Sequence, residues 1–102
     1  MKFKEAVTYD DMLLVPQYSD ITSRSEVDIR SYLGEKEFSI PIIASPMDTI
    51  AEAEMAKAMG DMGGLAVLHR YNSILEQQNM AKEVMSHPDW SGQVAAAIGV
   101  TG

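Results

Sequence analysis

The sequence predicts an α/β protein in which helices cover a short parallel sheet. Three apolar runs are bounded by Gly, Pro, Ser or Asp, as buried strands usually are, at residues 38–44, 65–68 and 94–100. The runs are almost continuously apolar, which is typical of strands covered on both faces. Two helical patterns separate them, so residues 38–102 are predicted to form two consecutive βαβ units.

The first helix is predicted between the first two strands. Apolar side chains recur there at spacings of three and four residues, from Ala51 to Met62. Thr49 and Glu52 have the spacing of a capping box at its start, and the glycine pair at 63–64 marks its end.

The second helix is predicted between the second and third strands. Ser73 and Glu76 repeat the capping-box spacing at its start, and His87-Pro88 ends it. Its apolar face is predicted to consist of Ile74, Leu75, Met80, Ala81, Val84 and Met85.

Residues 1–37 differ in pattern, and we expect them to form an extended N-terminal cover. They contain an apolar patch at 12–15 and a charged-apolar alternation at 26–30, and Gly34 permits a turn in a loop at 31–36. Three strands and two helices are too few to close a barrel, which needs eight strands and roughly 250 residues. The residues alone therefore leave open a partial barrel or a small open α/β sandwich.

Composition restricts the class of function. The 102 residues include no Cys, so the chain holds no disulfide, no zinc-thiolate site and no Cys nucleophile. With 15 acidic and 8 basic residues, the net charge of −7 disfavours nucleic acid as a partner. No stretch approaches the roughly 18 apolar residues of a membrane helix, and no signal-peptide pattern is present, so we expect a cytoplasmic protein without a membrane partner.

Candidate ligand groups lie in the loops that follow the strands, because parallel α/β sheets bind ligands at the carboxyl ends of their strands. Ser45 could hydrogen-bond a ligand and Met47 could pack on a flat ring, although Ser45 and Asp48 could equally cap the next helix. His69 and Arg70 could meet an anion, but a hydrogen-bonded buried His beside an Arg in solvent is the more common arrangement.

Other polar groups give weaker indications. The turn at 99–102 could present N–H groups to a phosphate, but it matches no nucleotide-binding fingerprint. Asp10, Asp11 and Asp20 match no calcium loop, and the two histidines lack the context of a zinc site. We therefore expect no metal site.

Four strings of residues resemble the opening of the IMP dehydrogenase and GMP reductase family. They are TYDDMLLVP at 8–16, SRSEVD at 23–28, PIIASPMDT at 41–49 and GGLAVLHR at 63–70. The resemblance runs over essentially the whole chain but covers only about the first third of the family's catalytic barrel. It implies that the fold is the N-terminal part of a (β/α)8 TIM barrel, in which the first three strands follow the cover.

The resemblance implies a purine nucleotide oxidoreductase. In this family a Cys thiolate attacks C2 of the purine, and hydride passes between that carbon and a nicotinamide. The dehydrogenase oxidises IMP to XMP with NAD, and the reductase converts GMP to IMP and ammonia with NADPH. The family's Cys belongs to later loops, so the chain would act only with the missing barrel or a second chain that supplies it. The rival interpretation is a non-catalytic scaffold or binding remnant.

The resemblance also implies roles for particular residues. Ser45 and Met47 fall in the loop that borders the substrate nucleotide, and Ser23 and Arg24 match a pair that reaches the dinucleotide of a neighbouring subunit in GMP reductases. Arg70 stands where reductases carry a Lys near the cofactor phosphate, which keeps the charge but changes the geometry. We expect NADPH as cofactor, with NAD as the alternative, and a homo-oligomer, which is a tetramer in relatives.

One feature separates the two activities of the family. Most of its dehydrogenases insert a regulatory pair of nucleotide-binding modules between the second helix and the third strand, where this chain has only residues 86–93. Together with the string at 23–28, the short connection favours a GMP reductase. Dehydrogenases without the insertion exist, however, and the string at 45–48 is found in them.

Overall fold

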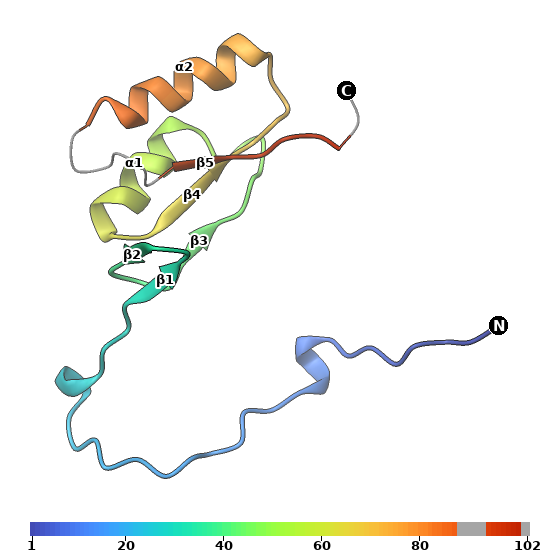
Figure 1. Ribbon diagram of the computed structural model, residues 1–102, viewed down its shortest axis with the longest axis vertical. Coiled ribbons are helices and arrows are strands. Elements are labelled where there is room, and N and C mark those ends of the chain that lie inside the picture. The colour runs from blue at the N-terminus through green and yellow to red at the C-terminus, as the bar shows by residue number, and fades with distance from the viewer. Residues whose placement is uncertain (88–93, 101–102) are drawn as a thin grey trace.

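A parallel sheet of three strands forms the centre of the computed structural model, which describes residues 1–87 and 94–100 (Figure 1). The strands lie in the order β3 (Ile43–Ala44), β4 (Leu65–Leu68) and β5 (Val94–Ala96). Helix α1 (Ala53–Met62) connects the first two and helix α2 (Ile74–Met85) connects the last two. Both pairings are parallel, which confirms the two predicted βαβ units.

Only the central strand has its predicted bounds. The run at 38–44 is interrupted by Pro41, which has no N–H group to extend the ladder, so β3 keeps only its last two residues. On either side of the proline, the Ile40 N–H donates to the Gly63 carbonyl and the Ile42 carbonyl accepts from Leu65. The run at 94–100 forms a strand only as far as Ala96.

The core lies between β4 and the two helices. Ala66 and Leu68 point to the same face of β4, because side chains alternate along a strand. They pack in one cluster with side chains of both helices, namely Ala53, Ala56, Met59 and Val84. The helices therefore cover one face of the sheet together, and an ion pair between Lys57 of α1 and Glu83 of α2 joins them.

Helix α1 begins later than predicted. Residues 47–51 form a turn of their own, in which the N–H groups of Ile50 and Ala51 donate to the Met47 carbonyl at 3.1 and 2.8 Å. The predicted capping box of Thr49 and Glu52 is wrong, since Glu52 is itself the N-cap residue and its side chain makes no capping hydrogen bond. The end of the helix is as predicted, with Gly63 in the left-handed region at φ 81°.

Helix α2 begins at the predicted capping box. The Glu76 N–H donates to Ser73 Oγ at 3.1 Å, and the Ser73 N–H donates to Glu76 Oε2 at 2.7 Å. The hydrogen bond from the Ser73 backbone, together with that of its side chain, lowers the pKa of the Glu76 carboxyl. Ser86 ends the helix one residue before the predicted His87-Pro88 stop, whose proline lies outside the described residues.

An antiparallel hairpin occupies the segment that was predicted as a loop. Its strands are β1 (Ser31–Leu33) and β2 (Lys36–Phe38), and Gly34 turns the chain at φ 63°, as predicted. Arg30, just before β1, donates to the carboxylates of Asp28 and of Glu37 on β2. The hydrogen bonds from Arg30 lower the pKa of the exposed Asp28 carboxyl to about 2.

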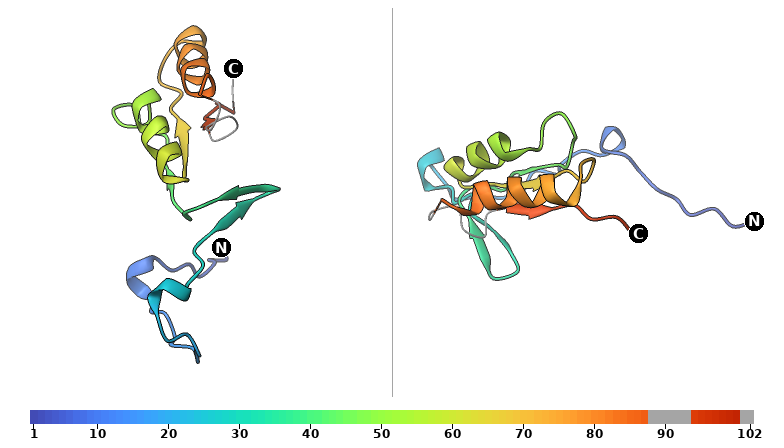
Figure 2. Two further views of the ribbon diagram at one scale, coloured as in Figure 1. Left: turned by 90° about the vertical axis from the view of Figure 1, so that its left-hand side faces the viewer. Right: turned by 90° about the horizontal axis from the view of Figure 1, so that it is seen from above.

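Residues 1–30 form an extended segment with two short 3₁₀ turns, η1 (Tyr9–Asp11) and η2 (Arg24–Glu26). The extended character agrees with the prediction, but in this chain the segment leads away from the sheet rather than lying over it (Figures 1 and 2). Its apolar side chains are exposed, with Leu13 at 94% and Leu14 at 98%. No helix in the described part of the chain is long and apolar enough to cross a membrane.

Gly34 and Gly63, which both have positive φ, offer a matched test of the packing at the end of α1. A Cβ at position 63 would lie 2.5 Å from the Ser39 Cβ, whereas a Cβ at position 34 would meet open space. Gly34→Ala is expected to lower the free energy of unfolding by about 1 kcal/mol, the cost of a left-handed backbone. Gly63→Ala adds a steric clash and is expected to cost roughly 2–4 kcal/mol. Urea unfolding followed by circular dichroism measures both, and equal losses would contradict the close contact.

Candidate functional site

The carboxyl ends of the three strands lie at one edge of the sheet, where the loops leaving them border two neighbouring clefts. The larger, here the acidic cleft, encloses about 490 Å³ between the segment before α1, the loop after β4 and helix α2. The smaller, here the Arg70 cleft, encloses about 260 Å³ between the loop after β4, the start of α2 and residues 97–99. Asn72 lines both clefts.

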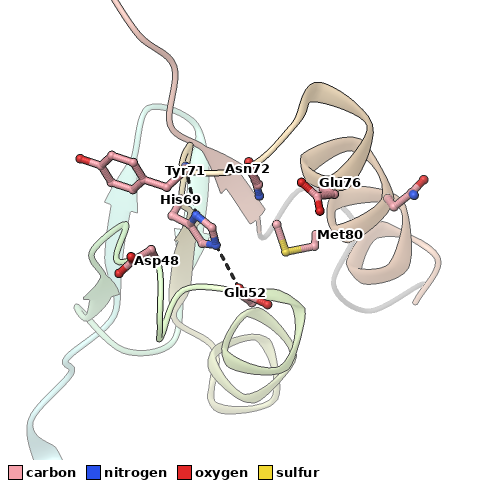
Figure 3. Close-up of a pocket in the computed structure, with 8 residues that line it drawn as sticks. Asp48, Glu52, His69, Tyr71, Asn72, Glu76 and Met80 are labelled. Atoms are coloured by element: carbon pink, nitrogen blue, oxygen red, sulfur yellow. Dashed lines mark hydrogen bonds and ion pairs between the residues drawn. The ribbon is translucent and has the colours of Figure 1, made fainter.

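His69 lies at the junction of these elements, directly after β4. It is 3% exposed, and each of its polar groups has a partner. Its Nε2 lies 3.1 Å from Glu52 Oε1, and its Nδ1 accepts the Tyr71 N–H at 3.1 Å (Figure 3). Its own N–H donates to the Ala51 carbonyl at 3.2 Å. The end of β4 is therefore attached to the start of α1.

Gln77 attaches helix α2 to the same edge. Its Nε2 donates to the carbonyls of His69 and Ala97, both at 3.0 Å. The Ala97 N–H in turn donates to the Leu68 carbonyl at 2.9 Å, which continues the pairing of β4 and β5. One side-chain amide thus satisfies two carbonyls at the ends of adjacent strands, which would otherwise be left without a partner.

The two clefts differ in charge. The residues lining the acidic cleft include the carboxylates of Asp48, Glu52 and Glu76 and no Lys or Arg (Figure 3). The residues lining the Arg70 cleft include a guanidinium and no carboxylate. An anionic group is therefore favoured in the Arg70 cleft and disfavoured in the acidic one.

The positive charge of Arg70 is available to a ligand. Its guanidinium lies over the Tyr71 ring, with Cζ 5.2 Å from the ring centroid, and it forms no ion pair in the described part of the chain. Beside it, the Nδ2 of Asn72 is buried without a hydrogen-bond partner among the described residues. The loop after β4 thus carries a cation and an amide donor that the protein itself does not use.

The structure brings three of the five predicted site residues to one edge of the sheet. Ser45 and Met47 are exposed on the segment after β3, and Arg70 lies on the loop after β4. Ser23 and Arg24 lie apart from them at η2, where Ser23 Oγ accepts the Ser25 N–H at 3.3 Å. The five positions are therefore divided between the sheet edge and the N-terminal segment.

The structure also decides between interpretations of these loops. Neither Ser45 nor Asp48 caps α1, because the turn at 47–51 separates them from its first residue. His69 is buried and hydrogen-bonded beside an exposed Arg70, which is the more common arrangement that the sequence indicated. Of the turn at 99–102, residues 101 and 102 lie outside the described residues. No cluster of His, Asp and Glu within residues 1–87 and 94–100 is placed to hold a metal ion.

Sequence reasoning did not find Glu52, Asn72 or Gln77 as site residues. Glu52 and Gln77 act on groups 17 and 20 positions away, so no local spacing identifies them. The signal available for Asn72 was its position in a loop between a strand and a capping box, where small polar residues are common.

Comparison with known proteins identifies one family. Its model, the IMP dehydrogenase / GMP reductase domain, matches residues 6–102. The inosine-5'-monophosphate dehydrogenase of Nitrosopumilus maritimus is 47% identical over 85 residues, which are 82% of this chain and 18% of that protein. The GMP reductase of Leishmania donovani is 44% identical over 81 residues, which are 78% of this chain and 16% of that protein.

A solved structure has the same fold over most of the chain. The crystal structure of GMP reductase from Trypanosoma brucei in complex with guanosine 5'-triphosphate superimposes with a TM-score of 0.75 at 47% identity. The match covers 82% of this chain and 20% of that one. The chain spans less than a fifth of the length of the curated relatives described above.

The contribution of Gln77 is testable in the chain itself. Gln77→Leu leaves the carbonyls of His69 and Ala97 without their side-chain donor, and we expect it to lower the free energy of unfolding by roughly 1–3 kcal/mol. The neighbouring Gln78 is exposed on the same helix, so Gln78→Leu is the control, with an expected change within about 0.5 kcal/mol. Urea titrations of both variants provide the comparison, and equal effects would contradict the bridging role.

Proposed function

Because the chain belongs to the IMP dehydrogenase and GMP reductase family, we propose that it is the N-terminal part of a purine nucleotide oxidoreductase of the GMP reductase type. Completed by the rest of the barrel, it would convert GMP to IMP and ammonia with NADPH, in the cytoplasm and as a homo-oligomer. The observation that carries the proposal is the family match over residues 6–102. It is supported by the sheet edge, where Arg70 has no ion-pair partner among the described residues.

In this proposal the chain binds and orients the nucleotides, while the reactive groups come from the rest of the barrel. The sequence has no Cys, so the thiolate that attacks the purine would have to come from the missing part of the barrel. Ser45 and Met47, exposed after β3, would border the purine nucleotide. The Ser45 hydroxyl would donate to or accept from the nucleotide, and the Met47 thioether would lie against the flat base.

The Arg70 cleft suits the phosphate of a dinucleotide. Arg70 has no ion-pair partner among the described residues, and those that line its cleft carry no negative charge. A guanidinium can hold a phosphate through two parallel hydrogen bonds, which a lysine cannot do. When bound, NADPH would supply the hydride, and Arg70 would fix its position. Ser23 and Arg24, on the exposed segment, would reach the dinucleotide of a neighbouring subunit.

A second candidate activity is IMP dehydrogenase, which oxidises IMP to XMP with NAD. Relatives named as dehydrogenases are as similar to the chain as those named as reductases, at 47% identity for Nitrosopumilus maritimus and 48% for Korarchaeum cryptofilum. The reductase is favoured by the connection after the second helix, since α2 ends at Met85 and β5 begins at Val94. That interval leaves no room for a regulatory module.

Two completed proteins test the proposal. The chain is joined to the remaining barrel of the Trypanosoma brucei GMP reductase and, separately, to that of the Nitrosopumilus maritimus dehydrogenase. We expect GMP-dependent oxidation of NADPH in the first protein to stay within about tenfold of the native reductase, and IMP-dependent reduction of NAD in the second to fall further below its parent. Activity retained only in the second protein would favour the dehydrogenase. Two folded proteins without activity would contradict both and favour a scaffold.

A further inference from the structure

The buried ring of His69 holds the loop that carries Arg70. We propose that His69 is a positioning residue for this loop: its Nδ1 fixes the loop while the ring is neutral, and protonation of the ring releases it. The contact is independent of the proposed function. Its consequence for cofactor affinity rests on the proposed function, through the role of Arg70.

The hydrogen bonds define the tautomer of the neutral His69 ring. The Tyr71 N–H points at Nδ1 over 3.1 Å, so Nδ1 must offer a lone pair and carry no proton. The proton of a neutral ring is then on Nε2, where it donates to Glu52 Oε1 at 3.1 Å (Figure 3). This tautomer satisfies both nitrogens, as a ring that is 3% exposed requires.

The backbone of the loop depends on this one hydrogen bond, beside which the Tyr71 ring stacks on the His69 ring with centroids 6.5 Å apart. In the described part of the chain, no other hydrogen bond involves the backbone of residues 70–72. His69 itself is anchored on both sides, since its N–H is bonded to the Ala51 carbonyl and its carbonyl to Gln77. The rigid group is therefore the histidine, and the loop is held to it through the Tyr71 N–H.

Protonation would break the contact without expelling the ring. An imidazolium carries N–H groups on both nitrogens, so Nδ1–H would face the Tyr71 N–H and the bond would be lost. The titratable groups that line the cleft beside the ring are Asp48 and Glu52 from the segment before α1, Glu76 from α2, and Tyr71 from the loop itself. The Arg70 guanidinium lies over the Tyr71 ring. Strands β3 and β5 contribute none. Of these groups, the Glu52 carboxylate is hydrogen-bonded to Nε2 and would face a positive ring directly.

Release of the loop would misplace the groups that it presents. Within the described residues, Arg70 forms no ion pair and the buried Nδ2 of Asn72 has no hydrogen-bond partner. Loss of one positioning hydrogen bond is expected to weaken binding of NADPH at Arg70 by up to about tenfold.

The tautomer can be measured on the 102-residue chain, which contains only two histidines. Labelling with ¹⁵N-histidine reports which ring nitrogen carries the proton, and His87→Asn identifies the signal of His69. We expect the Nε2–H tautomer above pH 8, and a Tyr71 amide signal that moves with the protonation of the His69 ring. An Nδ1–H tautomer, a ring that never titrates, or a Tyr71 amide that does not respond would overturn the proposal.

Two substitutions separate positioning from simple packing. In His69→Asn, the side-chain oxygen can still accept the Tyr71 N–H, whereas His69→Gln reaches towards Glu52 and leaves Tyr71 without a partner. In the completed reductase, we expect the KM for NADPH to rise about tenfold with Gln and less than threefold with Asn, while kcat changes little. The Asn variant should also lose the dependence of KM on pH between 5 and 8.

These readouts distinguish this inference from the proposed function. Equal rises of KM in both variants, or a pH dependence that survives in His69→Asn, would contradict the positioning role even in an active enzyme. A completed protein without activity refutes the proposed function, and the histidine and Tyr71 signals then still decide whether the ring holds the loop. His87→Asn, which lies outside both clefts, is the control for a nonspecific effect of losing a histidine.

Discussion

A buried histidine at the end of the central strand must find partners for both ring nitrogens and for its own peptide group. An unsatisfied polar group at such a position costs roughly 1–3 kcal/mol, which is a large fraction of the stability of a small domain. His69 meets the requirement with groups from three places: the start of α1, its own loop, and helix α2 through Gln77. The same contacts that satisfy the ring bring the loops of a candidate nucleotide site to one edge of the sheet.

The distribution of apolar surface agrees with the proposal that the chain is part of a larger barrel. Both helices cover one face of the sheet, and on the other face Ile43 is 54% exposed. The N-terminal segment exposes a further apolar stretch, including Leu13 and Leu14. In a completed barrel these surfaces would be positioned to pack against the missing strands and helices, and the carboxyl edge would continue into further loops.

Local signals predicted the parts of the fold that depend on local interactions. The capping box of Ser73 and Glu76 and the left-handed glycine at the end of α1 join residues within one turn, so their spacing identified them. The capping box predicted at Thr49 does not form because Glu52 is itself the N-cap residue, and its carboxylate bonds to His69, which is 17 positions away. The predicted lengths of β3 and β5 were wrong for a similar reason, because the pairing partners of a strand, and not its apolar residues, decide where the hydrogen-bond ladder ends. The contacts of Gln77 had no sequence signal.

We propose that this sheet edge binds a purine nucleotide and a dinucleotide through Ser45, Met47 and Arg70. A crystal structure of the chain completed by the reductase barrel, with GMP and NADPH bound, tests it most directly. We expect the purine beside Ser45 and Met47, and a cofactor phosphate within hydrogen-bond distance of the Arg70 guanidinium. Both nucleotides bound away from this edge, with Arg70 still in solvent, would contradict it.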